Sequence, residues 1–161
     1  MDIEKQRVEL IEMLGVHFEQ LYNLPPLGCR ILSTLILDGC KAGLTFDDLV
    51  HQFKASKSSV STNLNLLSKL GKITYYTLPN DRKKYYKPAA FSARLQNYSS
   101  MIANEQELVG QIMEYRQRTA SCDAEYNSLE NIKAYRAHLY DIEKLLTKTI
   151  NEFKSIENQR Q

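Results

Sequence analysis

Two short stretches with helical apolar spacing stand back to back at residues 45–71, and they constrain the fold more than any other part of the chain. In "LTFDDLVHQFK", Thr45 stands three residues before Asp48, which is the spacing of a helix-capping box. Ser56 can cap a second helix, which we expect to run to Gly71. Two short helices joined by so tight a turn are typical of a helix-turn-helix.

The second of these helices has two faces of different composition. At about 100° per residue, an apolar set falls within about 80° of Val60 and predicts the buried side: Leu64, Leu67 and Leu70. The opposite side carries serine, threonine and asparagine where exposed positions usually hold longer residues that favour the helix. Short polar side chains let a backbone approach another surface closely, and they can hydrogen-bond to phosphates or base edges. An ordinary serine-rich cap and surface is the alternative explanation.

A predicted β-hairpin follows this helix directly. Residues 73–78 and 84–87 are rich in β-forming side chains, and the segment "PNDRK" between them contains turn residues. A hairpin directly after a helix-turn-helix makes a winged helix, whose basic tip can reach a minor groove or the nucleic-acid backbone. The tyrosines of these strands are most simply packing residues: Tyr75, Tyr76, Tyr85 and Tyr86.

Positive charge is concentrated in the same segment. Residues 54–87 contain eight basic residues and one acid, a net charge of +7, although the whole chain carries only +2. Residues 1–53 carry −4 and residues 88–161 carry −1. Such a concentration is typical of a surface that meets nucleic-acid phosphates, although a solvated basic face would explain any single residue.

We therefore expect the partner to be double-stranded DNA. The residues expected to contact it from the second helix are Lys57, Ser58, Ser59, Ser61, Thr62, Asn65 and Lys69. Those expected at the tip of the wing are Arg82, Lys83 and Lys84. Lys72 is expected to add to the attraction for phosphates.

Two further helices are predicted upstream. Residues 2–22 repeat apolar side chains at helical spacing, and the prolines of "NLPPLG" end that helix. Residues 27–37 are apolar enough for a buried helix, which the glycines of "DGCKAG" end.

The C-terminal part carries an apolar repeat of its own. Within residues 132–156, apolar residues are spaced alternately by three and four positions, and such a heptad seam needs a partner. The residues that we expect at a dimer interface are Ile132, Tyr135, Leu139, Ile142, Leu146, Phe153 and Ile156. A second stripe lies upstream, beyond the break "RTASCDA", so an intramolecular helical hairpin is the alternative. We favour a dimer interface built from both helices and the N-terminal helix, because operators read by helix-turn-helix proteins are usually two-fold.

The sequence contains no recognisable catalytic or metal-binding motif. The three histidines, His17, His51 and His138, are far apart, and neither HxxxH nor HExxH occurs. A nucleophile elbow and a glycine-rich phosphate loop are also missing from the sequence. We therefore expect no catalytic residues, no metal, no cofactor and no enzyme activity.

Cysteine usage and hydropathy indicate a cytoplasmic location. The three cysteines, Cys29, Cys40 and Cys122, are widely spaced without a CxxC, which favours reduced thiols over a disulfide framework. Cys29 is expected to be a buried structural thiol rather than an oxidant sensor. No run of 18 apolar residues occurs, and "MDIEKQRVEL" lacks the apolar block of a signal peptide, so we expect no membrane association.

Several of these segments together resemble a known family. "LPPLGCRILSTLIL", "LTFDDLVHQFKASKSSVSTNLNLLSKLGKI" and "NDRKKYY" are similar to the GbsR-like branch of the MarR family of winged helix-turn-helix transcriptional regulators, over about residues 24–87. The resemblance implies a homodimer that places one recognition helix per subunit in the major groove, with the wing alongside. It also implies a small-molecule effector, whose identity no residue specifies. Thr62 stands where many relatives carry arginine, so the family's base preference is not carried over.

The expected architecture is mainly α with a small β-hairpin wing: a winged helix-turn-helix plus a helical dimerisation region. Residues 1–23 would form an N-terminal helix contributing to dimerisation, residues 24–89 the DNA-binding domain and residues 90–161 the C-terminal dimerisation region. The expected function is a sequence-specific transcriptional regulator, a repressor, that binds a pseudo-palindromic operator as a homodimer. The alternative is a winged-helix protein–protein interaction module with a coiled-coil region that binds its partner.

Overall fold

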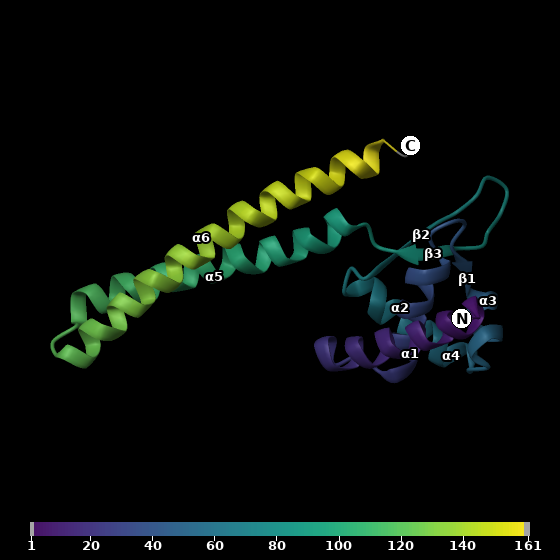
Figure 1. Cartoon of the computed structure of the whole chain (residues 1–161), viewed down its shortest axis with the longest axis horizontal. Helices are drawn as coiled ribbons and strands as arrows, with labels where there is room; N and C mark the ends of the chain where they lie inside the picture. The colour runs from purple at the N-terminus through teal and green to yellow at the C-terminus, as the bar shows by residue number, and fades with distance from the viewer. Residues whose placement is uncertain (1, 160–161) are drawn as a thin grey trace. The chain divides into compact units, whose positions relative to one another are not determined.

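The computed structural model describes residues 2–159 and divides the chain into two compact units, with the division between Ala89 and Ala90. The first unit contains α1 (Ile3–Tyr22), α2 (Pro26–Asp38), β1 (Leu44–Thr45), α3 (Phe46–Phe53), α4 (Lys57–Lys69), β2 (Ile73–Tyr76) and β3 (Tyr85–Pro88). The second unit contains α5 (Phe91–Thr119) and α6 (Asp123–Asn158), as Figure 1 shows. Residue 1 of the expected N-terminal helix and residues 160–161 of the expected C-terminal dimerisation region lie outside the described residues.

The expected fold class is confirmed, because α3 and α4 form a helix-turn-helix that is followed directly by a β-hairpin wing. Among the described residues, no helix is both long enough and apolar enough to cross a membrane.

One face of α1 packs along α2. Ile11 and Phe18 are buried there, whereas Val8 and Leu21 of the same apolar repeat are 50% and 52% exposed, because α2 covers only one side of α1. Two ion pairs hold the helices together: Arg7 donates from Nε to Asp38 at 3.0 Å, and Arg30 donates from Nη2 to Glu12 at 3.1 Å.

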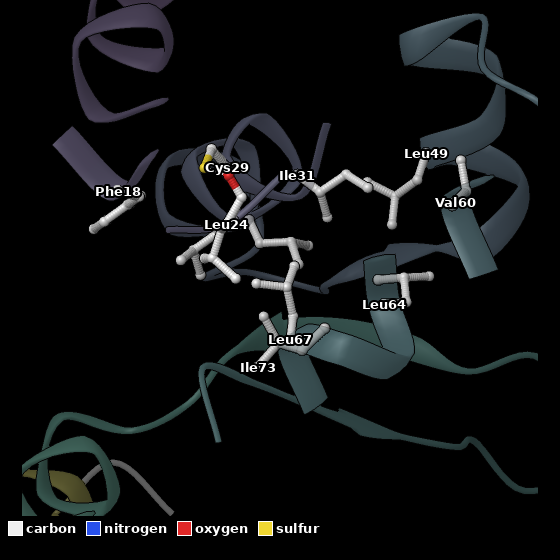
Figure 2. Close-up of a cluster of buried hydrophobic side chains, with 11 residues drawn as sticks. Phe18, Leu24, Cys29, Ile31, Leu49, Val60, Leu64, Leu67 and Ile73 are labelled. Atoms are coloured by element: carbon white, nitrogen blue, oxygen red, sulfur yellow. Dashed lines mark hydrogen bonds between the residues drawn. The ribbon is translucent and has the colours of Figure 1, made fainter. Parts of the chain in front are cut away.

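The core of the first unit is built around α2 (Figure 2). Ile31 and Leu35 of α2 are fully buried, as are Leu49 of α3 and Val60 of α4. Figure 2 shows Ile31, Leu49 and Val60 close together, where α2 meets the helix-turn-helix. Burying a side chain of this size contributes about 1.5–3 kcal/mol, so this contact fixes the position of α4 relative to α2.

The wing belongs to a three-stranded antiparallel sheet in the order β1-β3-β2. Thr45 of β1 lies opposite Tyr85, and Tyr76 of β2 lies opposite the same residue from the other side. The two hairpin strands were expected, but β1 was not, because two residues carry no recognisable strand pattern. The capping box predicted at the next helix is confirmed, since Asp48 N donates to Thr45 Oγ1 at 3.2 Å and Thr45 N donates to the Asp48 carboxylate at 2.8 Å.

The second unit is an antiparallel helical hairpin, in which α5 and α6 lie side by side (Figure 1). At the turn, Ser121 N donates to Glu125 at 2.8 Å. At the opposite end, Ser92 N donates to Glu157 at 3.2 Å. Hydrogen bonds from serine hold the pKa of each of these carboxyl groups below its usual range. The predicted break between the helices is confirmed at residues 120–122.

Much of the apolar seam of α6 packs within this hairpin. Leu139 is 1% exposed, and Ile132, Ile142, Leu146 and Phe153 are half-buried. The remaining two expected seam residues, Tyr135 and Ile156, are 43% and 46% exposed. The intramolecular hairpin is therefore present, and dimerisation by this seam stays a prediction.

Candidate nucleic-acid interface

The N-terminus of α4 is held by a cluster of three serines. Ser59 N donates to Ser56 Oγ at 3.2 Å, which confirms the predicted cap. The Ser56 hydroxyl also hydrogen-bonds to the hydroxyls of Ser58 at 3.1 Å and Ser59 at 2.8 Å. This cluster links two of the expected contact residues, Ser58 and Ser59, to the cap residue of α4.

One face of α4 is buried and the other is open. Val60, Leu64 and Leu67 are at most 2% exposed, as the spacing predicted. The expected contact residues of α4 are all exposed: Lys57, Ser58, Ser59, Ser61, Thr62, Asn65 and Lys69. The prediction for Leu70 is wrong, because this residue is 41% exposed. Helical geometry ends at Lys69, so the wheel no longer describes the position that follows.

Asn63 is a buried polar residue of α4 that the sequence argument missed. It is 7% exposed, and its Nδ2 donates to the Ser59 carbonyl at 2.8 Å. Its Oδ1 has no hydrogen-bond partner and faces Gly28, where an added Cβ would lie 2.7 Å away. The sequence could have predicted this burial, because Asn63 lies about 60° from Val60 on the helical wheel, on the apolar side. This contact brings α4 close to the first turn of α2.

The wing carries the expected basic residues at its tip. Arg82, Lys83 and Lys84 are all exposed. The ammonium of Lys84 lies 4.2 Å from the centre of the Tyr75 ring, a cation–π contact that holds it along the hairpin. The ring of Tyr75 in turn packs against Tyr86 at 5.8 Å, in agreement with the packing role expected of these tyrosines.

The lysines flanking α4 differ in their surroundings. Lys57 and Lys69 are exposed, whereas Lys72 is half-buried, with its ammonium 3.6 Å from the centre of the Tyr22 ring of α1. The structure therefore directs Lys72 toward α1.

Two acids of the first unit near these elements are held in local hydrogen bonds. Asp48 accepts hydrogen bonds from the side chain and backbone of Thr45, which lower its pKa. The backbone N–H of Lys83 donates to Asp81 at 2.9 Å, and this bond lowers the pKa of Asp81. Both groups are therefore charged near neutral pH, and each accepts hydrogen bonds from neighbouring protein donors.

Other chemistry finds little support in the geometry. Across residues 2–159, no three histidine, cysteine or acidic side chains are grouped so that they could hold a metal ion. Cys29 is buried, as expected, and its thiol donates a hydrogen bond to the Leu24 carbonyl oxygen at 3.6 Å. Burial raises the pKa of this thiol, which disfavours the reactive thiolate.

Comparison with solved structures places this fold among known ones. A crystal structure described as that of a transcriptional regulator matches with a TM-score of 0.70 and 21% sequence identity, over 93% of this chain and 99% of that one. At this identity the match establishes a shared fold, a winged helix-turn-helix joined to long C-terminal helices.

Other matches are weaker. A MarR family transcriptional regulator from Listeria monocytogenes, complexed with 26mer DNA, matches with a TM-score of 0.42 and 19% identity, over 98% of this chain and 92% of that one. MarR matches with a TM-score of 0.40 and 14% identity over the full length of both chains. No protein-family model and no curated protein matches the sequence.

Proposed function

We propose that this protein is a sequence-specific DNA-binding transcriptional regulator of the MarR family, GbsR-like branch, that acts as a homodimer. The proposal rests on the open face of α4. Its short polar side chains are all exposed on a helix whose other side is locked into the core, and a basic wing follows it in the same compact unit. A rigid helix with short hydrogen-bonding side chains is suited to the major groove.

The exposed residues divide into two roles. Thr62 and Asn65 carry the direct readout, because a hydroxyl and an amide can donate to and accept from base edges. Lys57, Lys69 and the wing tip attract phosphates, which adds affinity without sequence preference. Binding should therefore be both sequence-selective and strongly dependent on salt.

The test is selection from a library of random duplexes, followed by titration of the selected and a scrambled duplex by fluorescence anisotropy over a range of salt concentrations. We expect enrichment of a two-fold site whose half-sites are about one helical turn apart, roughly 10 bp. The logarithm of the binding constant should fall with the logarithm of the salt concentration with a slope of about 0.9 per phosphate contact. No enriched sequence, together with a flat salt dependence, would contradict the proposal.

The homodimer rests on a second apolar stripe, on α5. Six of its residues recur at steps of seven, three or four positions and are 42–64% exposed within the second unit: Phe91, Tyr98, Met101, Leu108, Ile112 and Tyr115. Contiguous apolar surface of this kind on a long helix is typical of an interface. An open, largely apolar groove of about 380 Å³ adjoins the stripe, where Ile112 of α5 meets Ile132 and Tyr135 of α6.

Self-association suits the central part of this stripe, because residues 95–104 contain no charged side chain and two copies can meet there without like-charge repulsion. The nearest charged residues on the same face of α5, Arg94 and Glu105, lie just outside this segment and are opposite in sign. The α6 seam then serves mainly the hairpin of its own chain, with Tyr135 and Ile156 left to extend the interface. The N-terminal helix is a separate proposed contribution to dimerisation, and its Leu10 and Met13 are 38% and 68% exposed.

Sedimentation velocity tests the dimer. Met101→Glu combined with Leu108→Glu places two charges in the stripe and should convert a dimer to a monomer. Gln96→Glu, on the other side of α5 by helical spacing, is the matched control and should leave the dimer intact. A wild-type protein that sediments as a monomer at micromolar concentration would contradict this part of the proposal.

Repression is the simplest mode of action, because an occupied operator by itself excludes polymerase. A reporter placed behind the selected site should be silenced by the protein, and compounds that act as effectors should release the DNA in the anisotropy assay. The alternative function, a winged-helix protein–protein module, would show dimer or partner binding without any sequence-selective binding of duplexes. We place the protein in the cytoplasm, where its DNA partner is found.

A further inference from the structure

Two charged residues, Arg94 and Glu105, interrupt the exposed apolar stripe of α5. The six apolar residues of the stripe leave two gaps of seven positions, and each of these charged residues stands inside one gap. With both included, the positions follow one another at alternating steps of three and four, which is the spacing of a coiled-coil seam: Phe91, Arg94, Tyr98, Met101, Glu105, Leu108, Ile112 and Tyr115. At 100° per residue, the first six fall within an arc of about 100°. The two charges therefore belong to the stripe itself.

Neither charge is paired within its own chain. Across residues 2–159, Arg94 and Glu105 form no ion pair, although both are half-buried. The Arg94 guanidinium lies 4.2 Å from the centre of the Phe91 ring, and its Nε is buried without a hydrogen-bond partner among the described residues. Glu105 accepts a hydrogen bond through Oε1 from the Tyr135 hydroxyl at 2.5 Å. Eleven positions along one helix separate the two charges by about 16 Å, so they cannot pair with each other in one chain.

The order of residues along the stripe is self-complementary in one antiparallel arrangement. In this arrangement a second copy of α5 runs in the opposite direction, and a two-fold axis passes midway between positions 99 and 100. Every seam position from 91 to 108 then faces a seam position of the second copy. The facing pairs, each formed twice, are Phe91 with Leu108, Arg94 with Glu105, and Tyr98 with Met101.

Other arrangements of two α5 helices leave the charges without a suitable partner. A parallel two-fold pair places Arg94 opposite Arg94 and Glu105 opposite Glu105, which is repulsive. If the antiparallel pair is shifted by seven positions in one direction, Arg94 faces Ile112 and Glu105 faces Met101. If it is shifted in the other direction, Arg94 faces Tyr98. Since a charge that loses water without gaining a partner is costly, the two charges discriminate against all three alternatives.

We propose that Arg94 and Glu105 determine how two copies of this chain pair, by forming two intermolecular ion pairs that fix an antiparallel α5–α5 contact. This inference rests on the proposed homodimer, to which it adds an orientation and a register. The uncharged residues 95–104 lie between the two ion pairs, in the middle of the contact. A polar contact within an apolar seam is a known means of fixing register.

The groove beside the stripe suits the same register. It lies where Ile112 of α5 meets Ile132 and Tyr135 of α6, and it is open and largely apolar. In the proposed contact, Phe91 of the second copy faces Leu108, which is one helical turn from Ile112. An aromatic side chain that is 58% exposed in the single chain is thereby brought next to an apolar groove.

Reversal of the two charges tests the ion pairs. Arg94→Glu creates two like-charge contacts in the homodimer, and so does Glu105→Arg, so each should weaken dimerisation at least about tenfold. The double variant Arg94→Glu with Glu105→Arg exchanges the charges and should dimerise as the wild type does. An equimolar mixture of the two single variants should also dimerise, because the heterodimer contains two contacts of opposite charge.

Glu107→Arg is the matched control for Glu105→Arg. It makes the same change of charge two positions away, at an exposed residue on the other side of α5. It should leave dimerisation unchanged, whereas an effect of net charge alone would weaken the dimer equally in both variants.

A cross-link tests the register without reversing a charge. Arg94→Lys keeps the positive charge and supplies an amine, which a carbodiimide joins to a contacting carboxylate as an amide. Mass spectrometry of the cross-linked dimer should find position 94 joined to Glu105. Because these positions are about 16 Å apart along one helix, this link must join two chains.

Sedimentation velocity measures dimerisation of the wild type and the variants, and circular dichroism shows whether each variant is folded. If the wild type dimerises but the folded single reversals dimerise as tightly, or the double reversal restores nothing, the proposed ion pairs are overturned. If the wild type is a monomer at micromolar concentration, the proposed homodimer fails instead. If a reversal variant does not fold, the cross-link decides, and a dimer of Arg94→Lys that is cross-linked only at other positions contradicts the register.

Discussion

The close approach of α2 and α4 gives the sharpest prediction about stability. Gly28 lies in the first turn of α2, and a Cβ added there would lie 2.7 Å from Asn63 Oδ1, against about 3.4 Å for an ordinary van der Waals contact. Gly28→Ala should therefore overpack this contact, and Asn63→Ala should relieve it by removing the oxygen. The two substitutions together form a double-mutant cycle.

The magnitude follows from three terms. Overpacking of a core contact typically costs about 1–3 kcal/mol. Replacing glycine by alanine in a helix stabilises the helix by up to about 1 kcal/mol, because alanine has the higher helix propensity. Asn63→Ala loses the hydrogen bond to the Ser59 carbonyl, worth about 1 kcal/mol. Gly28→Ala gains the same helix propensity whether residue 63 is asparagine or alanine, and Asn63→Ala loses the same hydrogen bond whether residue 28 is glycine or alanine. Both effects therefore cancel in the cycle. The coupling energy that remains comes from the clash alone, and we expect it to be about 1–3 kcal/mol.

Urea denaturation of the wild type, both single variants and the double variant measures this coupling. Gly28→Ala should destabilise the protein less in the Asn63→Ala background than in the wild type. A coupling below about 0.5 kcal/mol, the usual range for independent sites, would contradict the predicted overpacking between Gly28 and the Asn63 side chain. The same set of variants can be titrated with DNA, since a shift of α4 relative to α2 should weaken sequence preference.

Two further predictions concern the cap of α4 and the hydrogen bond between Ser92 of α5 and Glu157 of α6. Ser56→Ala removes the acceptor for Ser59 N and should destabilise the first unit by about 1 kcal/mol, measured by urea denaturation, and an unchanged midpoint would contradict the assigned cap. Ser92 lowers the pKa of Glu157, so the charged form of this carboxylate stabilises the hairpin above its unfolded pKa of about 4.3, and this contribution is lost as the pH falls through the lower folded pKa. Circular dichroism should therefore show a smaller loss of thermal stability on acidification from about pH 7 to about pH 3 in Ser92→Ala than in the wild type, and equal losses would contradict this origin of the pKa shift.

Local signals predicted the helices of the first unit well. The Thr45–Asp48 capping box and the Ser56 cap are confirmed, because cap hydrogen bonds span only three residues and therefore leave a pattern in the sequence. The apolar side of α4 was also correct as far as Leu67. Leu70 failed because the wheel was extended beyond the end of the helix.

Contacts between segments that are distant in the sequence were not predictable in the same way. β1 is two residues long and exists only through its pairing with β3, about 40 positions later in the chain. The hydrogen bond from Tyr76 to the Ala42 carbonyl likewise joins separate elements. Asn63 could have been placed on the buried side by its angle, but its position against Gly28 depends on how α2 crosses α4.

The C-terminal repeat shows a different limit. Heptad spacing indicates that a helix face needs a partner, but it does not say whether the partner is another helix of the same chain or of a second copy. In the structure α5 covers Leu139 of the α6 seam, and the stripe of α5 around Met101 and Leu108 remains exposed. The exposed stripe could be assigned only after the covered faces were known.

The most direct test of the central claim compares the wild type with the double variant Thr62→Ala and Asn65→Ala, each titrated with the selected duplex and its scrambled counterpart at one salt concentration. Both side chains are exposed on the open face of α4, so their removal should leave the fold intact. If this face reads DNA, the wild type prefers the selected duplex, and the double variant binds both duplexes with the wild type's affinity for the scrambled one. A double variant that keeps the full preference of the wild type would show that sequence is read elsewhere.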